Sequence, residues 1–291
     1  MAEDIEASSA GLRKVPNRLY EGYIFDLDGT IYLGDELLPG AKRLIFKLRD
    51  LGKRVVFLSN NPTKDPEMYA KKLTGMGIET PASEIINTVV SMTRWLSHNH
   101  PDATVFPIAE EPLKRALKEA SIRISERAEE IDIVVASYDR TFDYRKLQIA
   151  FDAIWYHKRA RLVTTNPDRY CPFPGGRGEP DAAAIVAAIE ACTGAKCEVN
   201  VGKPDAIMLE TVMHLLGLHA KDCVATGDRL YTDICMALDA GMPSAIVLTG
   251  ETKPETLADE VESKPTYVLE RIDQLLPQHL WEQFGWTEDE E

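Results

Sequence analysis

Short apolar runs alternate with longer amphipathic segments along most of this 291-residue chain. Tyr23-Ile24-Phe25 and the run 55–58 are typical of buried strands, and residues 41–51 between them, after Gly40, repeat apolar side chains at helical spacing. Such alternation predicts an α/β fold with a mainly parallel sheet, because parallel strands need a long crossover between them. The same pattern predicts further strands at 104–106, 131–135, 161–164, 223–226, 244–248 and 266–268, and helices at 66–76, 113–120, 144–156, 181–192, 204–216, 232–240 and 272–276.

The length corresponds to one large or two modest domains. Residues 99–196 show the same alternation of predicted strands and helices as the rest of the chain, and they have the size of a separate domain. Within this stretch, residues 166–180 are rich in proline and glycine, which predicts a loop. Residues 1–18 are small, polar and mixed in charge, so we expect a short disordered lead and no secretory signal.

Composition narrows the functional classes. The net charge of −14 argues against a nucleic-acid partner, since phosphate backbones need a basic surface. No apolar run is long enough to span a membrane. The chain has an odd number of irregularly spaced cysteines without a zinc-ligand pattern, which favours reduced structural thiols in a cytoplasmic protein over a metal or redox role. These are Cys171, Cys192, Cys197, Cys223 and Cys235.

Two carboxylates follow the first predicted strand, in the segment Asp26-Leu27-Asp28-Gly29-Thr30. Both reach one site at the strand end only if the chain turns there, and Gly29 permits such a turn. One aspartate then has the chemistry of a nucleophile toward phosphorus, and the other that of a proton shuttle. The alternative is that Asp28-Gly29 merely reverses the chain.

Two further polar segments are weaker signals on their own. Ser59-Asn60-Asn61 follows the second predicted strand, where a hydroxyl and backbone N–H groups suit a phosphate oxygen, although Asn-Asn-Pro is also a common turn. Lys203 precedes a proline at an expected helix start, where one positive charge would neutralise a phosphoryl group. The alternative for Lys203 is an ordinary solvated lysine.

The segment Gly227-Asp228-Arg229, continuing to Asp233, also lies between an apolar strand and a helix. Hard cations prefer oxygen ligands, and Mg²⁺ needs only one or two carboxylates, so Asp26 and Asp228 suffice for a magnesium site. The alternative for Asp233 is an acidic residue in a first helical turn, where the helix dipole favours it.

Taken together and in this order, the four segments resemble the four motifs of the haloacid dehalogenase superfamily. The resemblance extends over about residues 20–276, and it is to the large-cap subclass IIA, which contains nitrophenyl phosphatases, phosphoglycolate phosphatases and nucleotide monophosphatases. Three further matching segments are Thr165-Asn166-Pro167-Asp168, Ala240-Gly241-Met242 and Val247-Leu248-Thr249-Gly250.

This resemblance implies a Rossmann-like, doubly wound parallel sheet core made of residues 19–98 and 197–291. It implies that residues 99–196 form a smaller, inserted α/β cap domain, through which relatives commonly form a homodimer. The implied activity is Mg²⁺-dependent hydrolysis of small phosphate monoesters through an aspartyl-phosphate intermediate.

The resemblance also assigns roles to residues. Asp26 is the nucleophile, and Asp28 is the general acid and base that lends its backbone carbonyl to the metal. Ser59, Asn60 and Lys203 bind the phosphoryl group. The metal ligands are Asp26, Asp28 and Asp228, and the supporting residues are Asp233, Gly29 and Thr30.

The chain departs from the family in its cap loop, residues 169–181. Relatives have Pro-Gly before the next helix, whereas this chain has Glu179-Pro180-Asp181 and two arginines. The candidate substrate-selecting residues are therefore Asp168, Arg169, Tyr170 and Arg177. Arg169 and Arg177 have the chemistry to meet a second anionic group, or else they are solvated.

Two other functions share these motifs. A phosphomutase would use the same core but transfer the phosphoryl group to a sugar phosphate, and a regulatory module would bind without turnover. Asp28 and Asp228 argue against dehalogenation, because dehalogenases of the superfamily lack the second aspartate and need no metal. Every catalytic position expected from the four motifs carries a matching residue. This favours a phosphatase acting on a small phosphorylated metabolite, such as a sugar phosphate, a glycolate-type phosphate or a nucleotide.

Overall fold

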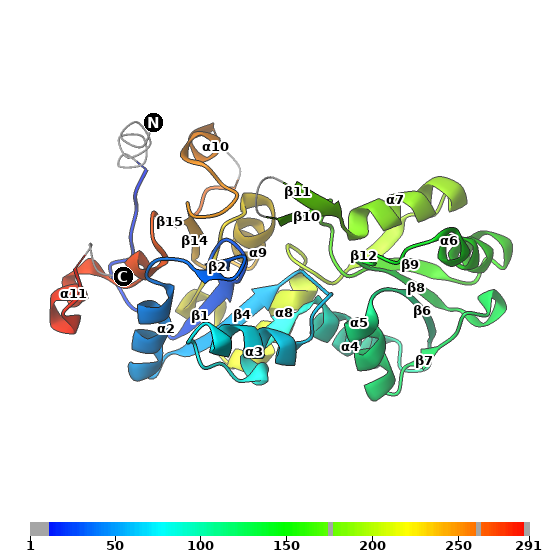
Figure 1. Ribbon diagram of the computed structural model, residues 1–291, viewed down its shortest axis with the longest axis horizontal. Coiled ribbons are helices and arrows are strands. Elements are labelled where there is room, and N and C mark those ends of the chain that lie inside the picture. Colours follow the sequence, from blue (N-terminus) through cyan, green and yellow to red (C-terminus); the bar gives the residue numbers. More distant parts are fainter. Residues whose placement is uncertain (1–11, 174–176, 260–262, 288–291) are drawn as a thin grey trace. The chain divides into compact units, whose positions relative to one another are not determined.

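The structure is a computed structural model that describes residues 12–173, 177–259 and 263–287 (Figure 1). It divides into two compact units. The first comprises Met1–Leu58, Ala70–Ile85 and Val212–Glu291, and the second comprises Ser59–Tyr69 and Ile86–Thr211. The predicted cap, 99–196, falls within the second unit, and its boundaries stay a prediction. Residues 1–11 of the expected lead lie outside the described residues, and Lys14 exchanges backbone hydrogen bonds with Val268.

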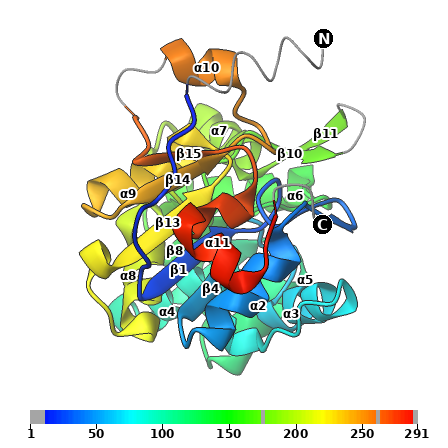
Figure 2. The same ribbon diagram turned by 90° about the vertical axis from the view of Figure 1, so that its left-hand side faces the viewer.

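A six-stranded sheet has the order β15-β14-β13-β1-β4-β5, and Figure 2 shows β15, β14, β13, β1 and β4 side by side. The pairs from β15 through to β4 are all parallel, as the sequence predicts. The strands are β1 (Gly22–Asp26), β4 (Arg54–Ser59), β5 (Ile85–Asn87), β13 (Cys223–Gly227), β14 (Ser244–Val247) and β15 (Tyr267–Leu269). A separate two-stranded hairpin consists of β2 (Tyr32–Leu33) and β3 (Glu36–Leu37).

Helical segments connect these strands. They are α2 (Ala41–Asp50), α3 (Pro66–Gly75), α8 (Ala206–Leu216), η5 (Ala220–Asp222), the π-helical turn η6 (Leu230–Ile234), α9 (Cys235–Asp239), α10 (Pro254–Asp259), η7 (Ile272–Leu275) and α11 (Gln278–Phe284), with η1 (Ala82–Glu84) before β5. In α2, Leu44, Ile45 and Leu48 are fully buried, as their spacing predicts. Four elements, β4, α3, β5 and α8, contain residues of both units.

The centre of the first sheet is aromatic. Tyr23 and Phe25 lie on one face of β1, and their rings stack with centroids 6.3 Å apart. Phe57 is the partner of Phe25 across the β1–β4 pair and packs against it at 6.1 Å. All three rings are fully buried. This packing fixes β1 in the middle of the sheet, directly before the Asp26 turn.

The second unit contains a five-stranded sheet of order β12-β9-β8-β6-β7, in which every pair is parallel. Its strands are β6 (Thr104–Ile108), β7 (Arg123–Ile124), β8 (Ile133–Ala136), β9 (Arg161–Thr164) and β12 (Cys197–Asn200). Its helical segments are α4 (Thr88–Asn99), α5 (Glu111–Glu119), η2 (Ala128–Glu130), α6 (Tyr144–Phe151), the π-helical continuation η3 (Asp152–Tyr156) and α7 (Ala182–Thr193).

This sheet lies between two helical layers (Figure 1). Alternate strand residues face opposite sides: Val105 and Ile133 belong to one buried cluster, and Phe106 and Val134 to the other. Helices α4 and α5 complete the first cluster, whereas α6, η3 and α7 complete the second. The second unit is thus a three-layer α/β structure, and the fold class predicted from the sequence is confirmed.

The structure corrects the prediction of a loop at 166–180. Tyr170–Phe173 and Arg177–Pro180 form an antiparallel hairpin, β10 and β11, in which Tyr170 faces Pro180 and Phe173 faces Arg177. Proline and glycine have low strand propensity, so composition alone predicted a loop. Four backbone pairs across the hairpin override that propensity.

Smaller differences concern helices. The helix predicted at 66–76 corresponds to α3, whose buried face carries Tyr69 and Leu73, whereas Met68 is exposed. Helix α8 begins at Ala206 rather than at Pro204, because the Asp205 carboxylate accepts a hydrogen bond from the Ile207 N–H at 3.1 Å.

The described part of the chain has no helix that is both long and apolar enough to cross a membrane. No disulfide joins any of the five cysteines, all of which lie in the described residues.

Candidate active site

Asp26 is the last residue of β1, at the carboxyl end of the sheet. Its backbone neighbour on β4 is Leu58, and the preceding Phe25 pairs with Thr226 of β13. Asp26 is half-buried, whereas the strand behind it is fully buried. The parallel arrangement therefore brings the ends of β1 and β13 to the same edge, where ligands of α/β sheets bind.

Three carboxylates meet at this edge. Asp26, Asp228 and Asp233 each offer one oxygen, and these oxygens all lie within 4.8 Å of one another. Asp228 and Asp233 are 4% and 3% exposed. Hard divalent cations prefer carboxylate oxygens, so this donor set fits such a metal.

Asp228 is held by the loop that follows β14. Its Oδ2 atom accepts a hydrogen bond from the Glu251 N–H at 2.7 Å, and its backbone carbonyl accepts from the Thr252 N–H at 3.1 Å. A Cβ atom on Gly250 would lie 2.0 Å from Asp228 Oδ2, and one on Gly29 would lie 2.5 Å from it. Both glycines are therefore required for this carboxylate to occupy its place.

Asp233 is held in the same way. Its Oδ2 accepts a hydrogen bond from the Arg229 N–H at 3.2 Å, while its own N–H donates to the Arg229 carbonyl at 3.1 Å. A Cβ on Gly227 would lie 2.2 Å from Asp233 Cγ. Asp233 is an acidic residue in the first turn of η6, as the alternative interpretation expects, and its carboxylate also closes the turn by accepting from the Arg229 N–H.

The turn after β1 is tight. Gly29 has a φ of 84°, a conformation that favours glycine, and its N–H donates to the Tyr32 carbonyl at 2.8 Å. Thr249 Oγ1 donates to the Gly29 carbonyl at 2.8 Å. Asp28 is exposed, whereas Thr30 is fully buried. The turn that the sequence required at Gly29 is confirmed.

A second group of predicted residues belongs to the second unit. Asn60 Oδ1 accepts from the Lys203 N–H at 2.8 Å, and Asn60 Nδ2 donates to the Lys203 carbonyl at 3.1 Å. Ser59 is buried, and its hydroxyl lies 3.0 Å from the Tyr69 hydroxyl. Thr88 Oγ1 donates to the Asn60 carbonyl at 2.9 Å. The second and third sequence motifs thus meet, although 143 positions separate Asn60 from Lys203.

Lys203 itself is only 3% exposed, so it is not the solvated lysine of the alternative interpretation. The peptide bond between Lys203 and Pro204 is cis. A Cβ on Gly202 would lie 2.6 Å from the Thr165 carbonyl oxygen and 2.8 Å from Asn60 Oδ1. Close backbone approach at Gly202 therefore allows the Asn60–Lys203 contact.

Asp168, a candidate for substrate selection, is buried and forms the centre of a polar network. Its Oδ2 accepts from Asn60 Nδ2 at 3.0 Å and from Asn166 Nδ2 at 3.1 Å. Asn166 also donates to Asp181 Oδ1 at 3.0 Å, and the same oxygen accepts from the Ala182 N–H that begins α7. Sequence reasoning missed Asp181, although an aspartate just before a helical run is an N-cap signal.

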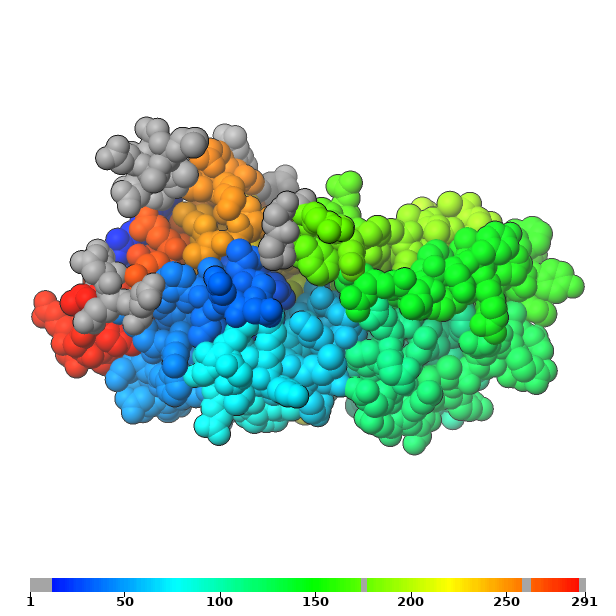
Figure 3. Space-filling view, in the orientation of Figure 1, coloured from blue at the N-terminus to red at the C-terminus, as the bar shows by residue number. Residues whose placement is uncertain are grey.

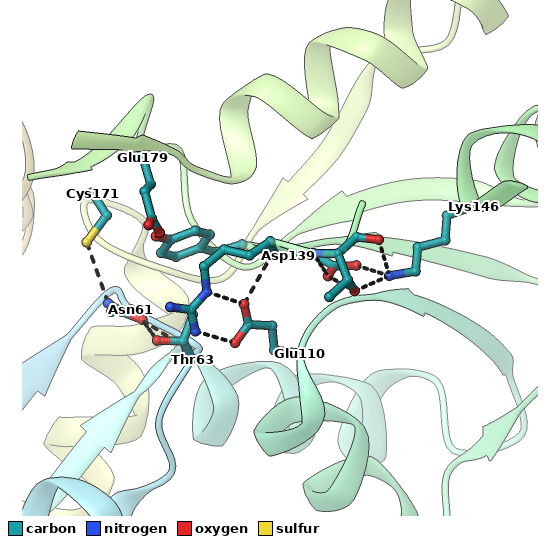
Figure 4. Close-up of polar contacts among 10 residues, drawn as sticks. Asn61, Thr63, Glu110, Asp139, Lys146, Cys171 and Glu179 are labelled. Atoms are coloured by element: carbon teal, nitrogen blue, oxygen red, sulfur yellow. Dashed lines mark hydrogen bonds and ion pairs between the residues drawn. The ribbon is translucent and has the colours of Figure 1, made fainter. Parts of the chain in front are cut away.

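The other three cap candidates lie together on the hairpin. Arg169, Tyr170 and Arg177 are exposed, and Figure 3 shows the hairpin segment on the molecular surface. They line a cavity of about 400 Å³ with Gly178, Glu179 and Pro180. Asn61 Nδ2 contacts Cys171 Sγ at 3.8 Å (Figure 4), so the hairpin also touches the Ser59–Asn61 loop within this unit.

Comparison with known proteins agrees with these features. The family model described as haloacid dehalogenase-like hydrolase matches residues 23–123, and a related HAD-hydrolase-like model matches residues 200–275. The sugar-phosphatase AraL of Bacillus subtilis is 37% identical over 251 residues, which are 86% of this chain and 90% of that protein. The 5'-nucleotidase YutF of the same organism is 31% identical over 89% of this chain and 99% of its own length.

A solved structure shares the fold. The 4-nitrophenylphosphatase of Thermotoga maritima matches with a TM-score of 0.83 at 34% identity, over 89% of this chain and 98% of that one. The chain therefore belongs to subclass IIA of the haloacid dehalogenase superfamily, and it is a phosphoric monoester hydrolase.

Proposed function

We propose that this protein is a Mg²⁺-dependent phosphatase that hydrolyses small phosphate monoesters through a phosphorylated Asp26. The observation that carries the proposal is the cluster of Asp26, Asp228 and Asp233, whose ligand oxygens lie within 4.8 Å of one another. Such a cluster, at the end of a parallel sheet, combines a nucleophilic carboxylate with a cation site.

The metal proposal is supported by the chemistry and the packing of these carboxylates. Asp26, Asp228 and the backbone carbonyl of Asp28 would hold Mg²⁺, and Asp233 would support the site. Gly29 and Gly250 leave free the space that the Asp228 carboxylate occupies. When bound, Mg²⁺ supplies positive charge that reduces the repulsion between the carboxylates and a phosphate dianion.

In the first step, a carboxylate oxygen of Asp26 attacks phosphorus and forms an O–P bond, while the bond from phosphorus to the ester oxygen breaks. Asp28 donates a proton to the leaving oxygen. In the second step, Asp28 takes a proton from water, whose oxygen attacks the aspartyl phosphate. Inorganic phosphate leaves and the Asp26 carboxylate is restored. The exposure of Asp28 suits a group that exchanges protons with solvent.

We further propose that Ser59, Asn60 and Lys203 bind the transferring phosphoryl group. The buried ammonium of Lys203 supplies a positive charge. The Asn60 side-chain amide is already engaged with Lys203 and Asp168, so its contact with phosphate would come from its backbone N–H. In this arrangement the Asn60 side chain positions the lysine segment.

The proposed substrates are small soluble phosphate esters. AraL is named for sugar phosphates, YutF for 5'-nucleotides and the Thermotoga enzyme for 4-nitrophenyl phosphate, so the same range is the natural screen for this chain. The free thiols of all five cysteines support a cytoplasmic location.

We also propose a homodimer formed through the cap. The α6–η3 segment of the second unit exposes Tyr144, Trp155 and Tyr156 at 78%, 54% and 69%. Trp155 stacks on Phe151 with ring centroids 5.1 Å apart, so the segment exposes one face of a stacked aromatic pair. Aromatic side chains are enriched in protein interfaces, so this surface suits a second copy of the chain.

The test of the mechanism is the Asp26→Asn variant, assayed on p-nitrophenyl phosphate with and without Mg²⁺. Asparagine keeps the shape of the side chain but is not a nucleophile, so hydrolysis should disappear while the fold, followed by circular dichroism, is retained. Asp239→Asn is the matched control, because Asp239 is exposed on α9 and outside the carboxylate cluster. Activity retained in Asp26→Asn would overturn the mechanism.

A further inference from the structure

The hairpin β10–β11 is fixed to the second unit at its base. The Asp181 N–H donates to the Arg169 carbonyl at 3.1 Å, which closes the open end of the hairpin. The Ala183 N–H donates to the Asp168 carbonyl at 3.1 Å, which ties the same end to α7. The start of α7 therefore holds the backbone that carries Arg169.

The hairpin cavity carries an excess of positive charge. Two arginines and one glutamate line it, and the glutamate is already engaged, because Glu179 accepts a hydrogen bond from the Tyr138 hydroxyl (Figure 4). Tyr138 is 2% exposed, so this contact anchors Glu179 at the buried side of the hairpin. Burial and the Glu179 contact both raise the pKa of Tyr138, which keeps the hydroxyl a donor.

The two arginines of the cavity are available to a ligand. Neither Arg169 nor Arg177 makes an ion pair with any residue in the described part of the chain. By contrast, Arg140 nearby holds Glu110 with two nitrogen–oxygen contacts of 2.6 and 2.7 Å. Each unpaired guanidinium presents five N–H donors in a planar fork, which is the geometry that binds carboxylate or phosphate oxygens in pairs.

Tyr170 adds an apolar wall to the cavity. Its ring lies against Gly178 on the opposite strand, where a Cβ atom would approach Tyr170 Cδ2 to 3.1 Å. The absence of a side chain at Gly178 therefore lets the ring lie across the hairpin. The result is a partly apolar surface, 53% exposed at Tyr170, in the cavity that the two arginines also line.

The cavity adjoins the loop proposed to bind the phosphoryl group, and all of these residues belong to the second unit. Asp168 is hydrogen-bonded to Asn60, and Cys171 contacts Asn61. Arg169 and Tyr170 are the two residues between those contacts. Consecutive Cα atoms are about 3.8 Å apart, so the Arg169 backbone lies within the length of a small phosphate ester from this loop.

We propose that Arg169 and Arg177 form a second anion site, which selects phosphate monoesters that carry an additional oxyanion, either a carboxylate or a second phosphate. The inference rests on the proposed function of the Ser59–Asn60 loop and adds the class of substrate. The positive charge of the two arginines is needed to attract an anionic substrate, because the whole chain carries a net charge of −14.

The experiment compares matched substrate pairs. Phosphoglycolate is measured against ethyl phosphate, which lacks the carboxylate, and a sugar bisphosphate is measured against the corresponding monophosphate. The wild-type enzyme should prefer the member with the second oxyanion in at least one pair, and the pair that discriminates identifies whether carboxylate or phosphate is recognised. Equal kcat/KM within both pairs would overturn the proposal.

The variants Arg169→Gln and Arg177→Gln then locate the preference. Each should lower kcat/KM for the preferred substrate by roughly 10- to 100-fold, mainly through KM, because a charge-assisted hydrogen bond is lost. Hydrolysis of p-nitrophenyl phosphate, which has no second oxyanion, should change by less than about twofold. Arg177→Lys should recover only part of the loss, since lysine cannot bind in the paired geometry.

Arg94→Gln is the matched control, because Arg94 is exposed on α4 and its loss changes the net charge equally. An equal effect of Arg94→Gln, or a parallel loss on p-nitrophenyl phosphate, would contradict a second anion site at the hairpin. A wild-type enzyme that hydrolyses p-nitrophenyl phosphate but shows no preference within the pairs refutes only this inference. An enzyme inactive on every ester overturns the proposed function as well.

Discussion

The side chain of Asn60 brackets the backbone of Lys203, accepting from its N–H at 2.8 Å and donating to its carbonyl at 3.1 Å. The same amino group donates to Asp168 at 3.0 Å. One amide thus joins the loop after β4, the segment before α8 and the base of the β10–β11 hairpin. Asparagine suits this position because it combines an acceptor and a donor in one planar group.

Asn60→Asp should therefore be damaging despite the similar size of the side chains. The aspartate keeps the acceptor for the Lys203 N–H, but it cannot donate, and it places a carboxylate against the Lys203 carbonyl and Asp168. We expect the free energy of unfolding to fall by about 1–3 kcal/mol in urea titrations. We expect kcat/KM to fall about 100-fold as the lysine segment shifts. Asn99→Asp, the same change at an exposed helix end, should have little effect on either; comparable losses in the two variants would contradict this account.

Gly250→Ala should weaken the metal site without replacing any ligand. The new methyl group would overlap Asp228 Oδ2, so the carboxylate must move. Displacing a ligand through its support typically lowers metal affinity by about 10- to 100-fold, and we expect a loss of that size in Mg²⁺ binding by calorimetry. Gly75→Ala is the control, because nothing lies within 4 Å of the place that its new methyl group would take. Unchanged Mg²⁺ affinity in Gly250→Ala would argue against Asp228 as a ligand.

Lys146→Met should leave the buried carboxylate of Asp139, in the second unit, without its partner. The Asp139 side chain has no exposed surface, and Lys146 Nζ lies 2.6 Å from its Oδ2 (Figure 4). Burial by itself raises the pKa of Asp139, but the hydrogen bonds from Lys146 and Thr141 outweigh burial and hold the pKa below its usual range. The ion pair therefore contributes stability above the unfolded-state pKa of about 3.9, and this contribution is lost as the pH falls through the folded-state pKa.

For Lys146→Met we expect a loss of about 3–5 kcal/mol in the free energy of unfolding near neutral pH, because the Asp139 carboxylate loses its partner. The deficit should be smaller at about pH 4 than at neutral pH, because the Asp139 carboxylate that has lost its partner takes up a proton more readily than the paired one. Adding Asp139→Asn should recover part of the stability at neutral pH. A deficit that is the same at both pH values would contradict this electrostatic explanation.

The proposed dimer predicts a mass of two chains by light scattering. Trp155→Glu places a charge in the exposed aromatic surface of α6–η3 and should shift the mass to one chain. Leu215→Glu is the control, because Leu215 is also exposed but lies in the first unit. A monomeric wild-type protein, or a Trp155→Glu variant that stays dimeric, would exclude this interface.

Much of the fold was predictable because local signals agreed with the tertiary structure. Tyr23-Ile24-Phe25 is a buried strand, and the turn that Gly29 permits follows it directly. Helix α4 was missed even though Asn87 caps it by accepting from the Val90 N–H, a signal present in the sequence. The sequence therefore contained a signal for the start of α4, and the prediction overlooked it.

Other features depend on contacts that no local pattern encodes. The sequence predicts that Asp168 lies in a loop and contacts substrate. In the structure Asp168 is buried, and it accepts a hydrogen bond from Asn60, which lies 108 positions away. The hairpin at Tyr170–Phe173 and Arg177–Pro180 forms despite its prolines, because the second unit anchors Glu179 through Tyr138. Such positions follow from the packing of distant segments and require the structure.

The most direct measurement of the central claim is the identity of the residue that carries the phosphoryl group. The Asp28→Asn variant should slow hydrolysis of the intermediate, because it lacks the group that activates water. The variant is mixed with p-nitrophenyl phosphate and Mg²⁺, quenched in acid and reduced with borohydride, which converts an aspartyl phosphate to homoserine. Homoserine at position 26 in the peptide mass spectrum is the predicted result. Homoserine elsewhere, or a phosphoryl group on another type of side chain, would contradict Asp26 as the nucleophile.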